Sequence, residues 1–182
     1  MTKEDTDMKR FTPASLVRGF FKVLISAFGN IFLLVIRFDL TRAMFNHAIW
    51  GGGRQATPKL EERMIKKLKA SEAMDDLLRR LVQNAKGDTF GKRGVVELKP
   101  SRFLRSDMYY ALQHIIYNID GARSGDGWSF NINVSDRFDF DNIRSSKKVK
   151  FEHLANDLGY ALQHFGIVTP YDINVLYEVD LT

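Results

Sequence analysis

The sequence contains no cysteine, and this absence excludes several kinds of site. Disulfide frameworks, zinc sites built on thiolates and cysteine nucleophiles all require that residue. Histidine is scarce: the four are His47, His114, His153 and His164. No two of them stand four positions apart, as the metalloprotease motif requires, so each is best explained as a structural side chain. A Gly-x-Ser-x-Gly motif is also absent, so nothing marks a serine nucleophile.

The composition is that of a folded protein with a basic surface. Of the 182 residues, 45% are hydrophobic and 27% charged, which is enough to bury a core. The formal charge of +5 suits a polyanionic partner, either nucleic acid or an anionic membrane surface. The cations are interspersed with acids, as in "KLEERMIKKLK", which favours a solvated helical face. The charge pattern therefore does not favour nucleic acid as a partner.

The most apolar stretch is "GFFKVLISAFGNIFLLVIRF", in which Lys22 is the one charge between residues 19 and 36. A bilayer span needs roughly 20 apolar residues, so the length is borderline. Lys22, Ser26, Asn30 and Arg37 recur at near-helical spacing and form a thin polar stripe. Three interpretations stay open: a buried hairpin of the folded domain, an interfacial helix, or one wall of a pore. A cleavable signal peptide is not expected, because acids and a long polar leader precede the stretch.

Breaks in the pattern divide the chain into three regions. Residues 1–50 form the apolar helical segment, with Thr12 as cap and Pro13 in the first turn. The flexible "WGGGRQ" leads into a helical region at 51–93, where helices start at Thr57–Pro58 and at Ser71. Residues 94–182 are expected to form an antiparallel sheet plus a helix. The fold class is α+β: N-terminal helices, one strongly apolar, followed by a mainly antiparallel sheet carrying one C-terminal helix.

Alternating polarity marks the strands of the last region. "GVVELK" and "DMYYALQHIIYNID" are predicted strands, and "DGARSGDG" is a predicted hairpin loop. Buried positions alternate with polar ones in the next strand and again at the C-terminus. The helix between them should end at Gly166. The residues predicted to face the core are Trp128, Phe130, Ile132, Val134, Ile173, Val175, Tyr177, Val179 and Leu181 on strands, and Leu154, Leu158, Ala161, Leu162 and Phe165 on the helix.

Three carboxylates, Asp136, Asp139 and Asp141, follow the end of a predicted strand, where functional residues often gather. They could hold a hard divalent cation, or one of them could act as a general base. The spacing does not match an EF-hand loop. In the alternative interpretation they accept backbone N–H bonds in a turn and pair with Arg137 and Arg144.

The segments "VSDRFDFDNIR" and "GIVTPYDINVLYEV", with a Leu- and Ala-rich helix between them, resemble the C-terminal catalytic domain of the colicin M family of lipid II-degrading bacteriocins. The order of parts is also similar to a toxin-like family encoded beside type VI secretion genes. Asp136 and Asp139 match the two carboxylates of the colicin M family, and Phe138 stands where that family usually has tyrosine. The family's His-Arg pair would fall near Ser145 and Ser146, where this sequence departs from the pattern.

The resemblance implies a metal-dependent phosphoester or pyrophosphate hydrolase that acts on a lipid-linked peptidoglycan precursor. Asp136 and Asp139 would bind Mg²⁺ or act as base, and Asp141 would be a further metal ligand. Arg144 would contact phosphate and His153 would act as acid.

Three functions follow as hypotheses. The first is an antibacterial toxin or type VI-like secreted effector, delivered to the periplasm and inner membrane of a target cell, with an immunity protein or a secretion carrier as partner. The second is a pore-forming effector that depolarises membranes through residues 16–50. The third is an adaptor of a secretion or phage particle.

Overall fold

The computed structural model describes residues 13–35, 37–97, 107–112, 114–140 and 151–181. Four helices come first: α1 Pro13–Val35, α2 Asp39–Trp50, α3 Pro58–Lys69 and α4 Glu72–Gln83. The strands are β1 Thr89–Glu97, β2 His114–Ser124, β3 Gly127–Phe138 and β4 Tyr171–Leu181. The short α5 Asp107–Ala111 precedes β2, and α6 Phe151–His164 precedes β4. The predicted α+β class, with helices before an antiparallel sheet that carries a C-terminal helix, is confirmed.

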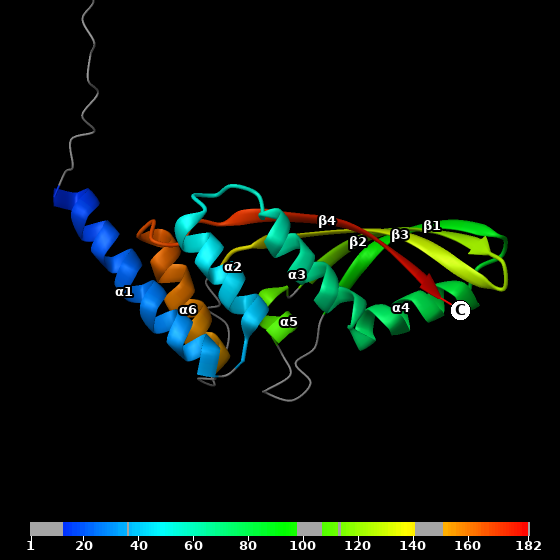
Figure 1. Cartoon of the computed structure of the whole chain (residues 1–182), viewed down its shortest axis with the longest axis horizontal. Helices are drawn as coiled ribbons and strands as arrows, with labels where there is room; N and C mark the ends of the chain where they lie inside the picture. The colour runs from blue at the N-terminus through cyan, green and yellow to red at the C-terminus, as the bar shows by residue number, and fades with distance from the viewer. Residues whose placement is uncertain (1–12, 36, 98–106, 113, 141–150, 182) are drawn as a thin grey trace, which may run out of the picture.

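The sheet is an antiparallel meander in the order β1-β2-β3-β4, and the helices lie along one side of it (Figure 1). Buried and exposed residues alternate along β4 from Tyr171 to Glu178, as a half-buried strand requires. The predicted inward positions of β3 are all buried, and Val179 and Leu181 at the end of β4 pack against the same core. The opposite face of the sheet carries exposed side chains, among them Val95 and Leu176.

The strands around the first hairpins are longer than the sequence predicts. The hairpin predicted at "DGARSGDG" is confirmed, but its turn contains only Gly125 and Asp126, because β2 continues to Ser124 and β3 begins at Gly127. In the same way β1 begins at Thr89, before the predicted start near Gly94. The glycines inside these strands leave space for aromatic side chains and do not end the strands. A Cβ on Gly121 would lie 2.7 Å from the Phe90 ring, and one on Gly94 would lie 2.5 Å from Tyr117 Oη.

The predicted strand "DMYYALQHIIYNID" is wrong over its first third, where the chain forms the single-turn helix α5. The Leu112 N–H closes that turn on the Met108 carbonyl at 2.7 Å. Ala111 and Leu112 are buried in the core, so this turn joins the helical layer to the sheet. A long-range contact of Asp107, at the start of the turn, outweighs the local strand pattern here.

Helix α6 ends as predicted but presents a narrower apolar face. Gly166 has a φ of 65°, and the Ile167 and Gly166 amides donate to the carbonyls of Leu162 and Gln163, both at 2.9 Å. This is a Schellman motif, which favours glycine. Leu162 is buried, whereas Leu158 and Phe165, which the sequence predicts to face the core, are 59% and 66% exposed. Only part of the predicted stripe therefore packs.

The helices α2, α3 and α4 each bury one apolar stripe in the core that they share with the sheet, and for α3 and α4 the spacing of the sequence predicts it. The buried side chains of these helices are Leu40, Met44, Ala48, Ile49, Leu60, Met64, Leu68, Met74, Leu77 and Leu78. In α3, Pro58 takes the first position after Thr57, where a missing N–H costs nothing.

Asp107 joins three helices. Its carboxylate accepts hydrogen bonds from the backbone N–H groups of Leu40 at 3.0 Å and Thr41 at 2.9 Å, and from the Thr41 hydroxyl at 2.8 Å. Phe38, at the N-cap position of α2, provides no side-chain acceptor, so an acid 67 residues away in sequence caps this helix. Lys67 of α3 completes the set with Nζ 3.1 Å from Asp107 Oδ2. Within the described residues, Asp107 is the one charged side chain that is buried.

Replacing Asp107 by alanine should lower the free energy of unfolding by about 2–3 kcal/mol, because two amides at the start of α2 lose a charged acceptor. Chemical denaturation followed by circular dichroism measures the change. Asp88→Ala is the matched control, since its ion pair with Arg123 is exposed and should contribute less than about 1 kcal/mol. Equal losses in the two variants would contradict this role of Asp107.

Candidate functional site

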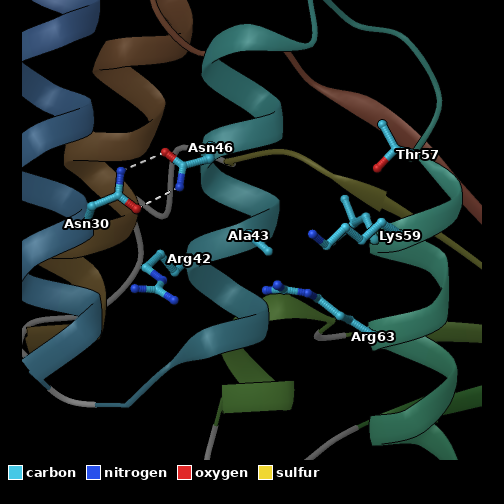
Figure 2. A pocket seen from close by; sticks show the side chains of 8 residues that line it. Asn30, Arg42, Ala43, Asn46, Thr57, Lys59 and Arg63 are labelled. Carbon is cyan, nitrogen blue, oxygen red and sulfur yellow. Dashed lines mark hydrogen bonds between the residues drawn. The ribbon is translucent and has the colours of Figure 1, made fainter.

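The polar stripe of α1 faces α2. Lys22 Nζ donates to the Ile49 carbonyl at 2.9 Å, at the last turn of α2. Asn30 and Asn46 exchange side-chain amide hydrogen bonds of 2.8 and 2.6 Å (Figure 2). Such a reciprocal amide pair satisfies one donor and one acceptor on each side chain at once. We call this set of contacts the polar seam.

Two further contacts complete the polar seam. Ser26 Oγ lies 3.1 Å from Asn46 Oδ1 and accepts a hydrogen bond from Trp50 Nε1 at 3.3 Å. Gly29 lets the helices approach, because a Cβ there would lie 2.6 Å from the Phe45 ring. Arg37, the fourth residue of the predicted stripe, is not part of the seam: it follows the end of α1 with a φ of 58°.

Because the polar side of α1 is turned inward, its apolar side is turned outward. We call these exposed side chains the outer face of α1: Leu16, Val17, Phe20, Phe21, Val23, Leu24, Phe28, Ile31 and Phe32. Phe20, Phe28 and Ile31 are each more than 60% exposed. An exposed apolar surface of this extent is unusual for a soluble monomer and marks an interaction site.

The orientation of α1 excludes one of the three interpretations of this stretch, the buried hairpin of the folded domain. The residues of α1 are not a buried core helix, because their apolar side chains are exposed. By length and composition, residues 14–33 are also able to cross a membrane. At 1.5 Å per residue they extend about 30 Å, close to the thickness of a bilayer core.

The predicted carboxylate site lies at the end of β3. Asp136 pairs with Ile173 in the sheet register, on the same face as the buried Val134 and Phe138. Its Oδ1 accepts a hydrogen bond from the Arg137 amide at 2.8 Å, which is the kind of contact that turns a chain. Asp136 is therefore held close to the backbone on the helix-covered side of the strand.

Arg137 lies on the opposite face and bridges two acids. Its Nη1 is 2.9 Å from Asp172 Oδ1, and its Nε is 3.4 Å from Asp139 Oδ2. Arg137 and Asp172 are cross-strand partners, so the sheet register fixes one half of this bridge. All three side chains are at least one-third exposed, so solvent reaches the cluster.

Aromatic packing holds this strand end in place. The Phe138 ring stacks on Tyr171 at 5.5 Å between centroids, and Tyr171 meets His47 edge-on at 4.5 Å. Burial raises the pKa of Tyr171, so its hydroxyl stays protonated and donates to the Met44 carbonyl at 3.3 Å. His47 is thus a structural histidine, as predicted: its Nε2 also lies 3.0 Å from the Arg54 carbonyl.

Phe140 attaches α6 to the same strand end. Its ring packs edge-on against Phe138 at 5.4 Å and fills the space beside Gly159 of α6, where any Cβ would clash with it. The Phe140 amide donates to Gln163 Oε1 at 3.1 Å. A rigid scaffold therefore supports the solvent-accessible set of Arg137, Asp139 and Asp172, an arrangement typical of binding and catalytic sites.

Part of the predicted site lies outside the described residues. Asp141 and Arg144 belong to residues 141–150, and the description of His153 covers its backbone position in α6 alone. In the described part of the chain, no three His, Asp or Glu side chains lie close enough to hold a metal ion. Asp139 is instead paired with Arg137. The described residues therefore do not provide a complete Mg²⁺ site, and a role for Asp136, Asp139 and Asp141 as its ligands stays a prediction.

Two residues of these surfaces are not identified by the sequence analysis. Asp172 belongs to a predicted strand, and only the strand register shows that it faces Arg137. Asn46 looks like an ordinary polar position until α2 is packed on α1. The available signal is Asn30 itself, since a buried amide requires a partner that can both donate and accept.

Comparison with known proteins provides little guidance. No family model matches the chain, and no curated protein matches its sequence. Among solved structures, the chain has a weak similarity to PaeM, a colicin M-like bacteriocin produced by Pseudomonas aeruginosa, at 19% identity and a TM-score of 0.33. The match covers 78% of this chain and 50% of PaeM, so the chain spans about half the length of that bacteriocin. A likeness at this level carries no argument about function.

Proposed function

We propose that this chain acts at a membrane surface, with the outer face of α1 in the lipid interface and the sheet domain in water. The observation that carries the proposal is the orientation of α1: its polar atoms bond to α2, and its large apolar side chains are exposed. Trp50 stands beside the polar seam, 55% exposed, and tryptophan is enriched at membrane–water interfaces.

An interfacial helix fits the contacts better than a spanning one. In an interfacial position α1 keeps every hydrogen bond of the polar seam, because α2 lies on its water side. A spanning position would take Lys22 and Asn30 from α2 into hydrocarbon, at several kcal/mol for each unpaired polar group. For the same reason, a pore lined by this stripe requires α1 to separate from α2.

A membrane-surface position supports the toxin hypothesis over the adaptor hypothesis. An antibacterial toxin that meets a lipid-linked substrate at the inner membrane of a target cell needs such an attachment. Its delivery by a type VI-like route and its pairing with an immunity protein or a secretion carrier remain part of this proposal.

Changing Phe20 and Phe28 together to serine should weaken binding to neutral phosphatidylcholine vesicles at least tenfold, because each buried phenylalanine contributes about 1–2 kcal/mol. Vesicle flotation measures the bound fraction. The control is Val95→Ser with Leu176→Ser, which removes two equally exposed apolar side chains from the open face of the sheet. A wild-type chain that does not float, or equal losses in both variants, would contradict the proposal.

A second proposal concerns the end of β3: we propose that Asp136 and Asp139 support hydrolysis of a phosphate-containing lipid-linked substrate. One carboxylate would take the proton of the attacking water, and Arg137, already beside Asp139, would face the negative charge of the phosphate. Arg144 as a further phosphate contact and His153 as the acid belong to the same proposal. The position of Asp139, one-third exposed beside Arg137 at a rigid strand end, supports it.

Replacement of Asp139 by asparagine should lower the release of water-soluble phosphate from such a substrate by about 100-fold or more, if this carboxylate is the base. Asp172→Asn is the matched control, because it removes the other acid bound to Arg137. If both changes reduce turnover equally, Asp139 acts by positioning Arg137. If neither reduces it, the hydrolytic role is excluded, whereas vesicle binding is unaffected in every case.

A further inference from the structure

A cationic cavity lies between α1, α2 and α3, behind the outer face of α1 (Figure 2). Its volume of about 310 Å³ is at the small end of the range of about 300–1,000 Å³ found for ligand pockets. The residues that line it are Asn30, Arg42, Ala43, Asn46, Thr57, Lys59, Leu60 and Arg63. This set holds three cations and no acid.

Two of these cations have no acidic partner among the described residues. Lys59 and Arg63 reach from α3 toward Ala43 of α2 (Figure 2). Each of the six ion pairs in the described part of the chain involves other side chains, and one of them joins Arg42 to Asp39 at 3.2 Å. Lys59 and Arg63 therefore bring uncompensated positive charge to the cavity.

The positions of these two cations lower the stability of α3. Lys59 and Arg63 are four residues apart, so they stand one above the other on α3, and like charges at this spacing destabilise a helix. Lys59 also lies in the first turn of α3, at the positive end of its macrodipole, where anions are favoured and cations are not. An anion between them would relieve both penalties.

Groups that can bind an anion surround the same space. Thr57 precedes α3, and its hydroxyl makes no capping bond to the helix. The Asn30 and Asn46 amides form the wall toward α1, and Ala43 keeps the floor open because its side chain is a single methyl group. The Thr57 hydroxyl, the Lys59 ammonium and the Arg63 guanidinium are donors of the kind that bind phosphate, whereas the Asn30 amide already donates to Ser26 and Asn46.

We propose that this cavity binds the phosphate of an anionic lipid headgroup while the outer face of α1 lies among the lipid tails. The inference rests on the proposed membrane function and adds a lipid preference to it. The polar seam joins the two surfaces: Asn30 contacts Asn46 and lines the cavity, while Phe28 and Ile31 of the same helix point outward. A lipid at the edge of α1 can therefore present its headgroup to Arg63 and Lys59.

The test compares flotation with vesicles of phosphatidylcholine alone and of phosphatidylcholine containing 30% phosphatidylglycerol. The wild-type chain should prefer the anionic vesicles, and Lys59→Gln with Arg63→Gln should remove most of that preference, a loss of at least about fivefold. The control, Lys86→Gln with Lys92→Gln, removes the same charge outside the cavity and should change the preference less than twofold. Equal losses would mean that net charge alone is responsible, and would overturn the proposal.

A second variant tests the cavity without changing any charge. Ala43→Leu fills the space beside Lys59 and Arg63, so the preference for anionic vesicles should fall although the net charge stays at +5. An unchanged preference in this folded variant would overturn the cavity as the site. Sodium phosphate should release the bound protein from anionic vesicles more effectively than sodium chloride at equal ionic strength, because free phosphate competes with the lipid headgroup for the cavity. Selective binding of free phosphate without a vesicle preference would also contradict the proposal.

Binding to neutral vesicles tests the membrane function, and the preference for anionic vesicles tests the headgroup site. If binding to neutral vesicles fails, the membrane function itself is wrong. If it persists in every cavity variant and no lipid preference exists, only the headgroup site is wrong.

Discussion

The carboxylate of Asp107 is the contact on which the helical layer depends. It caps the N-terminus of α2 by accepting two backbone hydrogen bonds, and it forms an ion pair with Lys67 of α3. Helix α2 in turn connects α1 with the sheet. Its Asn46 side chain donates a hydrogen bond to Asn30 of α1, and its Met44 carbonyl accepts one from the Tyr171 hydroxyl of β4. The outer face of α1 and the strand end that carries the acids are therefore positioned through one helix.

The sequence predicts those features that repeat along it. The strand alternation at Trp128 and Phe130 and the stop at Gly166 follow from period and local chemistry, and the structure agrees with them. Errors occur where a distant contact decides: Asp107 turns a predicted strand into α5, and the Phe90 ring explains a glycine inside β2. For α1, no local pattern shows whether its polar or its apolar side meets the neighbouring helix.

Helix α1 illustrates that limit. Its thin polar stripe predicts an amphipathic helix, but the same stripe would fit an interface, a bundle or a pore. Packing resolves the orientation, because Asn46 and the Ile49 carbonyl are the partners that Asn30 and Lys22 require. The end of β3 shows the opposite case: strand position predicts where Asp136 and Asp139 lie, yet the ion pair of Arg137 with Asp172, which lies beside that of Arg137 with Asp139, depends on the register of β3 against β4.

Because the chain has no cysteine, a single one can be introduced and labelled at any position of α1. The most direct test of the account places an environment-sensitive fluorophore at Phe28 and, in a second protein, at Leu176, and adds neutral vesicles carrying a nitroxide in the lipid tails. The account predicts a blue shift and strong quenching at position 28 with neither at 176, since only the first side chain belongs to the outer face of α1. Equal signals at both positions, or no change at 28, would contradict an interfacial α1.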